Sequence, residues 1–155
     1  NIITSLALES DVQERFNRKL AAKYEVIKEN EVKYEEYQTE DAEYLFVAFG
    51  CSSRICEAVV DQLREEGVKC SIVSVPSEGL FRSQCPEYQA QVLPAGVKKF
   101  GLTAGLPVNL QGLVPAHEGK VWGLESFGFS APYTVLDEKL GFTAQNVYNQ
   151  VKAMF

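Results

Sequence analysis

Apolar positions in the first part of the chain follow a helical repeat. Five residues recur at spacings of four, four, four and three: Val12, Phe16, Leu20, Tyr24 and Ile27. This spacing places them on one face of an amphipathic helix. Ser10 is a natural N-cap for it, and Asp11 and Lys28 suit the two ends of the helix dipole. Residues 31–37 either extend this helix or form an extended segment, and the pattern leaves both open.

An uninterrupted apolar run at residues 44–49 predicts a buried parallel strand. Helical spacing follows it and ends at Gly67, a residue that suits the left-handed C-cap of a helix. Residues 68–75 form a second predicted strand. A strand, a helix and a strand in this order predict a right-handed crossover between parallel strands.

In the second half of the chain, segments with the apolar pattern of strands alternate with segments that have the spacing of helices. The remaining predicted elements are a short helix, two strands and two helices, at residues 87–92, 99–103, 120–124, 132–140 and 143–154. Thr143 is a good cap for the last helix. We therefore expect an α/β fold, a three-layer αβα sandwich with a mostly parallel sheet of about five strands. We expect one of these strands to be antiparallel, near the C-terminal part.

Composition narrows the class of protein. A chain of 155 residues with 46% hydrophobic and 23% charged residues is typical of one globular domain, so we expect a single domain over residues 1–155. The net charge of -6 repels phosphate backbones and anionic lipid, which argues against nucleic-acid and membrane partners. The chain has four cysteines, Cys51, Cys56, Cys70 and Cys85. Three of them lie in runs that are typical of core or helix. We expect reduced thiols and a cytoplasmic protein.

The turn from Gly50 to Arg54 is the sharpest candidate for binding, because it joins the carboxyl end of a strand to a helix N-terminus. Free N–H groups there attract anions, and Ser52, Ser53 and Arg54 add donors. The alternative is that Ser52 or Ser53 only caps the helix. Ser130 is the expected cap of the helix at 132–140, and a second helix N-terminus there would complete an anion pocket. The glycines of dinucleotide and P-loop sites are absent.

Other chemistry has weaker support. Cys51 at a helix start and the single histidine, His117, form a conceivable thiol and base pair, without the spacing of any known family. The cysteines contain no C-x-x-C pair, and one histidine completes no zinc pattern, so we expect no metal site. We assign no catalytic residue.

Four segments of the second half resemble the C-terminal domain of transketolase: Ser74 to Ser77, Tyr88 to Pro94, Glu125 to Pro132 and Leu140 to Val147. The last two are the most specific, because they look like the F-G-x-S-A-P and F-G-F-T-x-x-N-V pattern of that family. The front half, residues 1–73, instead resembles the equivalent domain of the α subunit of 2-oxoacid:ferredoxin oxidoreductases, especially the ketoisovalerate type. The seam falls near residues 70–75, which suggests a chimera, engineered or natural.

The resemblance implies a non-catalytic structural or assembly domain. In both families thiamine diphosphate and its magnesium ion are bound by other domains, so we expect no cofactor in this chain. The expected partners are those thiamine-binding domains, or a second copy in a homodimer. A small-anion-binding regulatory module at the Gly50 to Arg54 turn is the alternative function.

Overall fold

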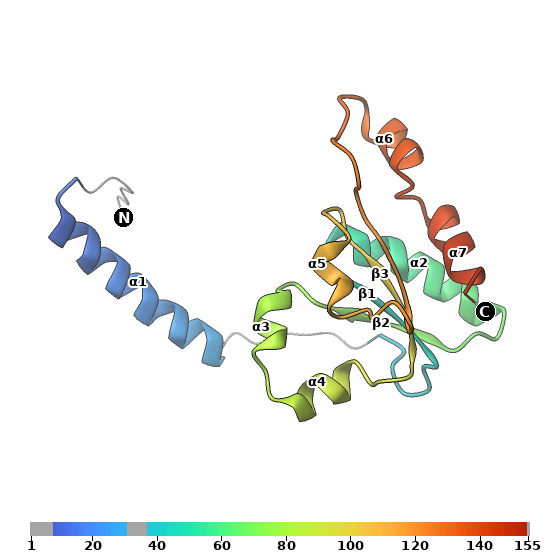
Figure 1. Ribbon diagram of the computed structural model, residues 1–155, viewed down its shortest axis with the longest axis horizontal. Helices are drawn as coiled ribbons and strands as arrows, with labels where there is room; N and C mark the ends of the chain where they lie inside the picture. Colours follow the sequence, from blue (N-terminus) through green and yellow to red (C-terminus); the bar gives the residue numbers. More distant parts are fainter. Residues whose placement is uncertain (1–7, 31–36, 155) are drawn as a thin grey trace. The chain divides into compact units, whose positions relative to one another are not determined.

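The computed structural model describes residues 8–30 and 37–154 (Figure 1). Contacts divide the chain into two compact units, residues 1–34 and 35–155. The seam expected near residues 70–75 lies inside the second unit, in its second strand. A single domain over the whole chain stays a prediction.

The first unit contains helix α1 (Ser10–Asn30), which confirms the predicted amphipathic helix. Ser10 is the first residue of α1 rather than the residue before it. Salt bridges between neighbouring turns join Arg18 to Glu14 at 2.5 Å and Lys28 to Glu25 at 2.7 Å. No residue of α1 is buried, so its apolar stripe is exposed. Within the ambiguous segment at 31–37, residues 31–36 lie outside the described residues.

The second unit is built on a parallel sheet. Its strands are β1 (Tyr44–Ala48), β2 (Cys70–Ser74), β3 (Lys98–Leu102) and β4 (Gly119–Trp122). Their order is β2-β1-β3-β4, with every pair parallel. This confirms the α/β class and the predicted crossover.

The count of strands differs from the expected five. Four strands are present in the described residues, and the antiparallel strand expected near the C-terminal part is not among them. The chain after β4 is exposed instead of pairing with the sheet edge. An antiparallel bridge occurs elsewhere, between Tyr37 and Ile72 on the outer side of β2.

One face of the sheet is covered by α2 (Cys51–Glu65) and α7 (Ala144–Lys152). These helices enclose the larger core, in which the rings of Phe46 and Phe100 meet edge to face at 6.0 Å. A hydrogen bond also joins the two helices at the protein surface, because the Tyr148 hydroxyl of α7 donates to Glu66 at the end of α2 at 2.7 Å. Thr143 caps α7 as predicted, accepting from the backbone N–H of Asn146.

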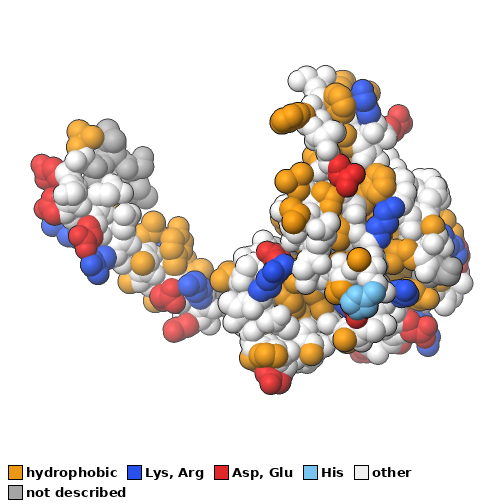
Figure 2. Space-filling model, viewed as in Figure 1, with side chains coloured by type: hydrophobic (Ala, Val, Ile, Leu, Met, Phe, Trp, Pro, Cys, Tyr) orange, Lys and Arg blue, Asp and Glu red, His pale blue; other side chains and the backbone are white. Residues whose placement is uncertain are grey.

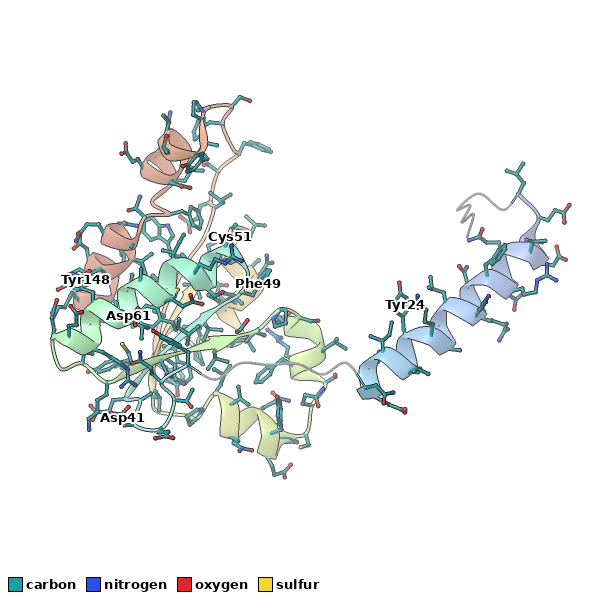
Figure 3. The ribbon with its side chains drawn as sticks, turned by 180° about the vertical axis from the view of Figure 1, so that it is seen from behind. Tyr24, Asp41, Phe49, Cys51, Asp61 and Tyr148 are labelled. Atoms are coloured by element: carbon teal, nitrogen blue, oxygen red, sulfur yellow. The ribbon has the colours of Figure 1, made fainter. Side chains whose placement is uncertain are left out.

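The opposite face has a thinner cover. Helix α5 (Val108–Gln111) lies on it, and α3 (Glu78–Arg82) and α4 (Pro86–Val92) flank it. Five buried residues form the core on this side: Val47, Val75, Leu110, Leu113 and Val114. Helix α6 (Tyr133–Leu140) buries none of its residues, and it extends beyond the end of the sheet in Figures 1 and 3.

Candidate functional site

The Gly50 to Arg54 turn lies where the sequence placed it, at the carboxyl end of β1 and the start of α2. Gly50 is the N-cap residue, with a φ of 59° in the left-handed region that glycine adopts without strain. The Ser53 hydroxyl donates to the Gly50 carbonyl at 2.7 Å, and Ser52 is buried. No side chain caps the first turn of α2, so the prediction that Ser52 or Ser53 caps this helix is wrong. Arg54 is exposed.

Ser130 does not cap α6 either. Pro132 occupies the N-cap position, without a side-chain hydrogen bond. Its fixed φ suits the start of a helix, and this displaces the expected cap by two residues. Ser130 is exposed, and no hydrogen bond joins it to the Gly50 to Arg54 turn in the described part of the chain. Because β3 lies between β1 and β4, the two turns leave strands that are not neighbours. The shared anion pocket stays a prediction.

We expect inorganic phosphate at millimolar concentration to leave the backbone amide NMR signals of Ser52 and Ser53 unchanged. The Ser53 hydroxyl already donates to the Gly50 carbonyl within the turn, so it is not available to an anion. Signals of both serines that move with phosphate in the wild type, and stay still in Arg54→Ala, would establish the anion site instead.

Cys51 and His117 lie at opposite edges of the sheet. Cys51 follows the carboxyl end of β1, whereas His117 precedes the amino end of β4. Because these strands run parallel, the topology separates the two side chains, and the thiol and base pair is wrong. The sequence alone did not indicate this separation of Cys51 and His117, because both residues lie in polar turns.

The cysteines are divided between core and surface. Cys56 and Cys70 are buried, and Cys51 and Cys85 are exposed. Cys51 and Cys56 lie in α2 and Cys70 lies in β2, which confirms that three of the four cysteines belong to core or helix. Burial raises the pKa of the Cys70 thiol to about 11 and raises that of Cys56 further, so both buried thiols stay protonated and unreactive. Within residues 8–30 and 37–154, no group of three acidic, histidine or cysteine side chains is arranged to hold a metal ion.

Charged side chains gather at the amino edge of the sheet. Arg64 donates to the Cys70 carbonyl at 2.7 Å and to Asp41 at 2.8 Å, and its guanidinium lowers the pKa of the Asp41 carboxyl. Lys69 and Glu43 pair nearby at 3.4 Å. These contacts attach residues 38–43 to the end of α2 and the start of β2. Figure 3 shows Asp41 at this end, away from Phe49 and Cys51.

Lys99 is the least expected charged residue, because its side chain is only 2% exposed. Its ammonium group donates to Glu118 at 2.6 Å and to the carbonyls of Pro94 at 2.7 Å and Val97 at 3.1 Å. Glu118 also accepts from the Gly96 N–H at 2.6 Å, and that bond, followed by Lys99, lowers the pKa of its carboxyl. All donors of Lys99 are satisfied, so the pair holds the chain together and is not free to act as a general acid.

Comparison with known proteins identifies the family. A family model described as "Transketolase-like TK C-terminal domain" matches residues 31–143, more than half of the chain. The chain belongs to this family. Helix α1 precedes the matched residues, and the whole sheet of the second unit falls within them.

Transketolases from several bacteria are similar in sequence. The enzyme from Bacillus subtilis is 36% identical over 118 residues, which is 76% of this chain and 17% of that protein. The ketoisovalerate oxidoreductase subunit VorB from Methanothermobacter marburgensis is 47% identical over 73 residues, 47% of this chain and 21% of that protein. The chain therefore spans about a fifth of the length of these relatives.

Solved structures agree with the fold. Transketolase from Campylobacter jejuni superposes with a TM-score of 0.67 at 26% identity, over 76% of this chain and 18% of that one. Transketolase from Leishmania mexicana gives 0.66 at 28% identity, over 74% of this chain and 17% of that one. The relatives are transketolase-type enzymes, and the region shared with this chain is their C-terminal domain, which is not itself catalytic.

The comparisons extend the transketolase likeness beyond the expected half. The match to the Bacillus subtilis enzyme covers 118 residues, more than residues 74–155 contain, so it includes part of the front half. The family match also runs across residues 70–75 without interruption. The resemblance to VorB is confirmed alongside it.

Proposed function

We propose that this chain is a non-catalytic assembly domain of the kind found in transketolase and in ketoisovalerate oxidoreductase. One observation carries the proposal: the likeness is to the C-terminal domain alone, about a fifth of each relative. The described residues of the chain support this role. Their strong polar contacts hold parts of the fold together, and the buried thiols are unreactive.

Thiamine diphosphate fits this chain poorly. In enzymes of this class the diphosphate is bound through a magnesium ion, which prefers carboxylate and carbonyl oxygens in octahedral geometry. No cluster of metal-ligating side chains occurs in the described residues, and the sequence contains no G-D-G stretch, which marks the metal-diphosphate site in the enzymes that this chain resembles. We therefore assign the cofactor to other domains of the parent enzymes.

A further solved structure contains the same fold within a longer chain. A protein described as a split-gene transketolase, an inactive β4 tetramer, shares the fold with a TM-score of 0.59 at 16% identity, over 44% of its length. That description applies to that protein.

We expect the purified chain, supplied with thiamine diphosphate and magnesium, to show neither ketol transfer nor 2-oxoacid oxidation above a protein-free blank. Calorimetric titration with the cofactor is expected to give no saturable heat. The reason is that residues 8–30 and 37–154 contain no cluster of side chains that could hold the metal ion of the diphosphate. Turnover by the isolated chain, or cofactor bound in a one-to-one ratio, would overturn the proposal.

The two-family origin is a finer part of the proposal. It rests on the two separate likenesses, 47% identity to VorB over 73 residues and 36% identity to a transketolase over 118. Separate alignment of residues 1–73 and 74–155 against both families tests it. An abrupt change of nearest relative within β2 supports joining of two parents, and equal similarity on both sides contradicts it.

A further inference from the structure

Helix α1 has an apolar face that no core of the described chain covers. All 21 residues of the helix lie outside the two cores, and none of them is buried. The helix also precedes residues 31–143, which match the family model, so its apolar residues are not part of the fold that this family shares. In proteins most of the stability of a helix comes from the packing of its apolar face. The apolar face of α1 is therefore a candidate surface for a partner.

This face is one continuous row of side chains, which we name the α1 stripe: Val12, Phe16, Leu20, Tyr24 and Ile27. Residues three or four positions apart are neighbours on the surface of a helix, so each member of the stripe lies beside the next. The last four are between 39% and 52% exposed. At the rise of an α-helix the stripe is roughly 22 Å long. Figure 2 shows hydrophobic side chains gathered towards the C-terminal end of α1, and Figure 3 shows Tyr24 projecting from the helix.

Positive charge follows one flank of the stripe. Arg15, Lys19 and Lys23, which we name the cationic row, each precede a stripe residue by one position and recur every four residues along the same side. Within residues 8–30 and 37–154 these three side chains form no ion pair. The other two cations of α1 are both paired with glutamates of the same helix. The cationic row is therefore available to carboxylates that come from outside the helix.

A second copy of α1 does not supply those carboxylates. In an antiparallel pair of helices the cationic row lies against its own copy, and in a parallel pair it lies against the opposite flank of the stripe. That flank consists of Gln13, Asn17 and Ala21, which carry no charge, and Glu25, which already pairs with Lys28. Neither pairing brings a free carboxylate to the cations, and the antiparallel one adds repulsion.

An anionic membrane is disfavoured as well. Residues 31–155 contain 16 acidic and 10 basic residues, whereas residues 1–30 contain five of each. The larger part of the chain therefore carries the whole net charge of -6 and is repelled by anionic lipid. Among residues 8–30 and 37–154, no helix has the length and the apolar character that crossing a bilayer requires.

We propose that α1 binds an amphipathic helix of another protein, whose apolar face is flanked by a row of Asp or Glu residues at four-residue spacing. The inference rests on the proposed assembly function and deepens it by naming the element that binds and the chemistry of its partner. The α1 stripe packs against the apolar face of the partner, and the cationic row faces its carboxylates. Apolar burial supplies the affinity, and the charges select an acidic partner and fix its register.

Isothermal titration calorimetry of the full chain with two synthetic helical peptides tests this proposal. Both peptides have the length of α1 and the same face of leucine and isoleucine. The acidic peptide has a row of Glu beside that face, and the basic peptide has Lys at the same positions. We expect the acidic peptide to bind in a one-to-one ratio, with an affinity that falls as the salt concentration rises, and the basic peptide to give no saturable heat.

Neutral variants separate the cationic row from the other cations of the helix. Arg15→Gln, Lys19→Gln and Lys23→Gln together are expected to weaken binding of the acidic peptide about tenfold, because three exposed ion pairs are lost. Glutamine has nearly the same helix propensity as these residues, so α1 is retained. The matched control is Arg18→Gln with Lys28→Gln, which removes the two paired cations and is expected to change the affinity by no more than about twofold.

A second variant tests the apolar part of the interface. Phe16→Ala with Leu20→Ala removes the centre of the α1 stripe and preserves the helix, because alanine has the highest helix propensity. It is expected to weaken binding of the acidic peptide at least about tenfold. Circular dichroism of each variant verifies that the helix content is retained.

Any of four results would overturn the proposal. The acidic peptide could fail to bind the wild type, the two peptides could bind equally well, or the control could lose as much affinity as the variant of the cationic row. The fourth result is that Phe16→Ala with Leu20→Ala leaves peptide binding intact but abolishes dimerisation of the chain, or its flotation with vesicles of equal parts phosphatidylglycerol and phosphatidylcholine. None of these measurements depends on catalysis or on thiamine diphosphate, so the proposed function and the α1 interface fail separately.

Discussion

Lys99→Met is expected to lower the free energy of unfolding by about 3–5 kcal/mol, the usual cost of removing one partner from a buried ion pair. The substitution leaves the Glu118 carboxylate, only 11% exposed, without its cation, and it leaves the Pro94 and Val97 carbonyls without a donor. Urea unfolding followed by the fluorescence of Trp122, the single tryptophan, measures the change. Lys98→Met, an exposed neighbour on the same strand, is the control, with an expected change within about 0.5 kcal/mol.

The same pair makes stability depend on pH. A hydrogen bond from the Gly96 N–H, and a smaller contribution from the hydrogen bond of Lys99, hold the pKa of Glu118 below its ordinary value of 4.5. A carboxyl whose pKa is lowered by folding stabilises the folded protein above its unfolded pKa and loses that contribution as the pH falls through its folded pKa. Wild-type stability should therefore fall below pH 4.5, and Glu118→Gln should show a flatter dependence there. An equally steep fall in Glu118→Gln would contradict this assignment.

Gly119→Ala is expected to destabilise the chain by about 3 kcal/mol, at the upper end for overpacking. A Cβ atom at this position would lie 1.7 Å from the Lys99 carbonyl oxygen, which belongs to the backbone of the neighbouring strand. Relief requires β4 to move away from β3, and this breaks the pairing of Lys99 with Gly119. Thermal and urea unfolding measure the loss.

Gly79→Ala is the matched control for this substitution. A Cβ atom at Gly79 meets nothing within 4 Å, and the residue lies in α3, where alanine is favoured over glycine. We expect no loss of stability. A Gly119→Ala chain that is as stable as Gly79→Ala would show that the close approach at Gly119 relaxes at no cost.

The regular elements could be predicted because their residues repeat over long stretches. The apolar run of β1, the helical spacing of α2 and the Gly at its end agree with one another, and the structure confirms them. Helices α3 and α5 were missed, since four or five residues are too few to show a helical period. The Tyr37 to Ile72 bridge was also missed, because the partner of an edge residue depends on tertiary contacts.

The candidate site was less predictable than the fold. The sequence located the Gly50 to Arg54 turn, but the direction of the Ser53 hydroxyl depends on the backbone carbonyl beside it. The distance between Cys51 and His117 depends on strand direction and order.

The two outer strands of the sheet limit what kind of aggregate this protein forms. β4 is only four residues long and carries Lys120 on its exposed side, while Tyr37 already pairs with Ile72 on the outer side of β2. Neither border offers a long row of free backbone groups to an incoming strand, which is the step that propagates fibrils. Growth by strand addition is therefore disfavoured at both borders of the sheet.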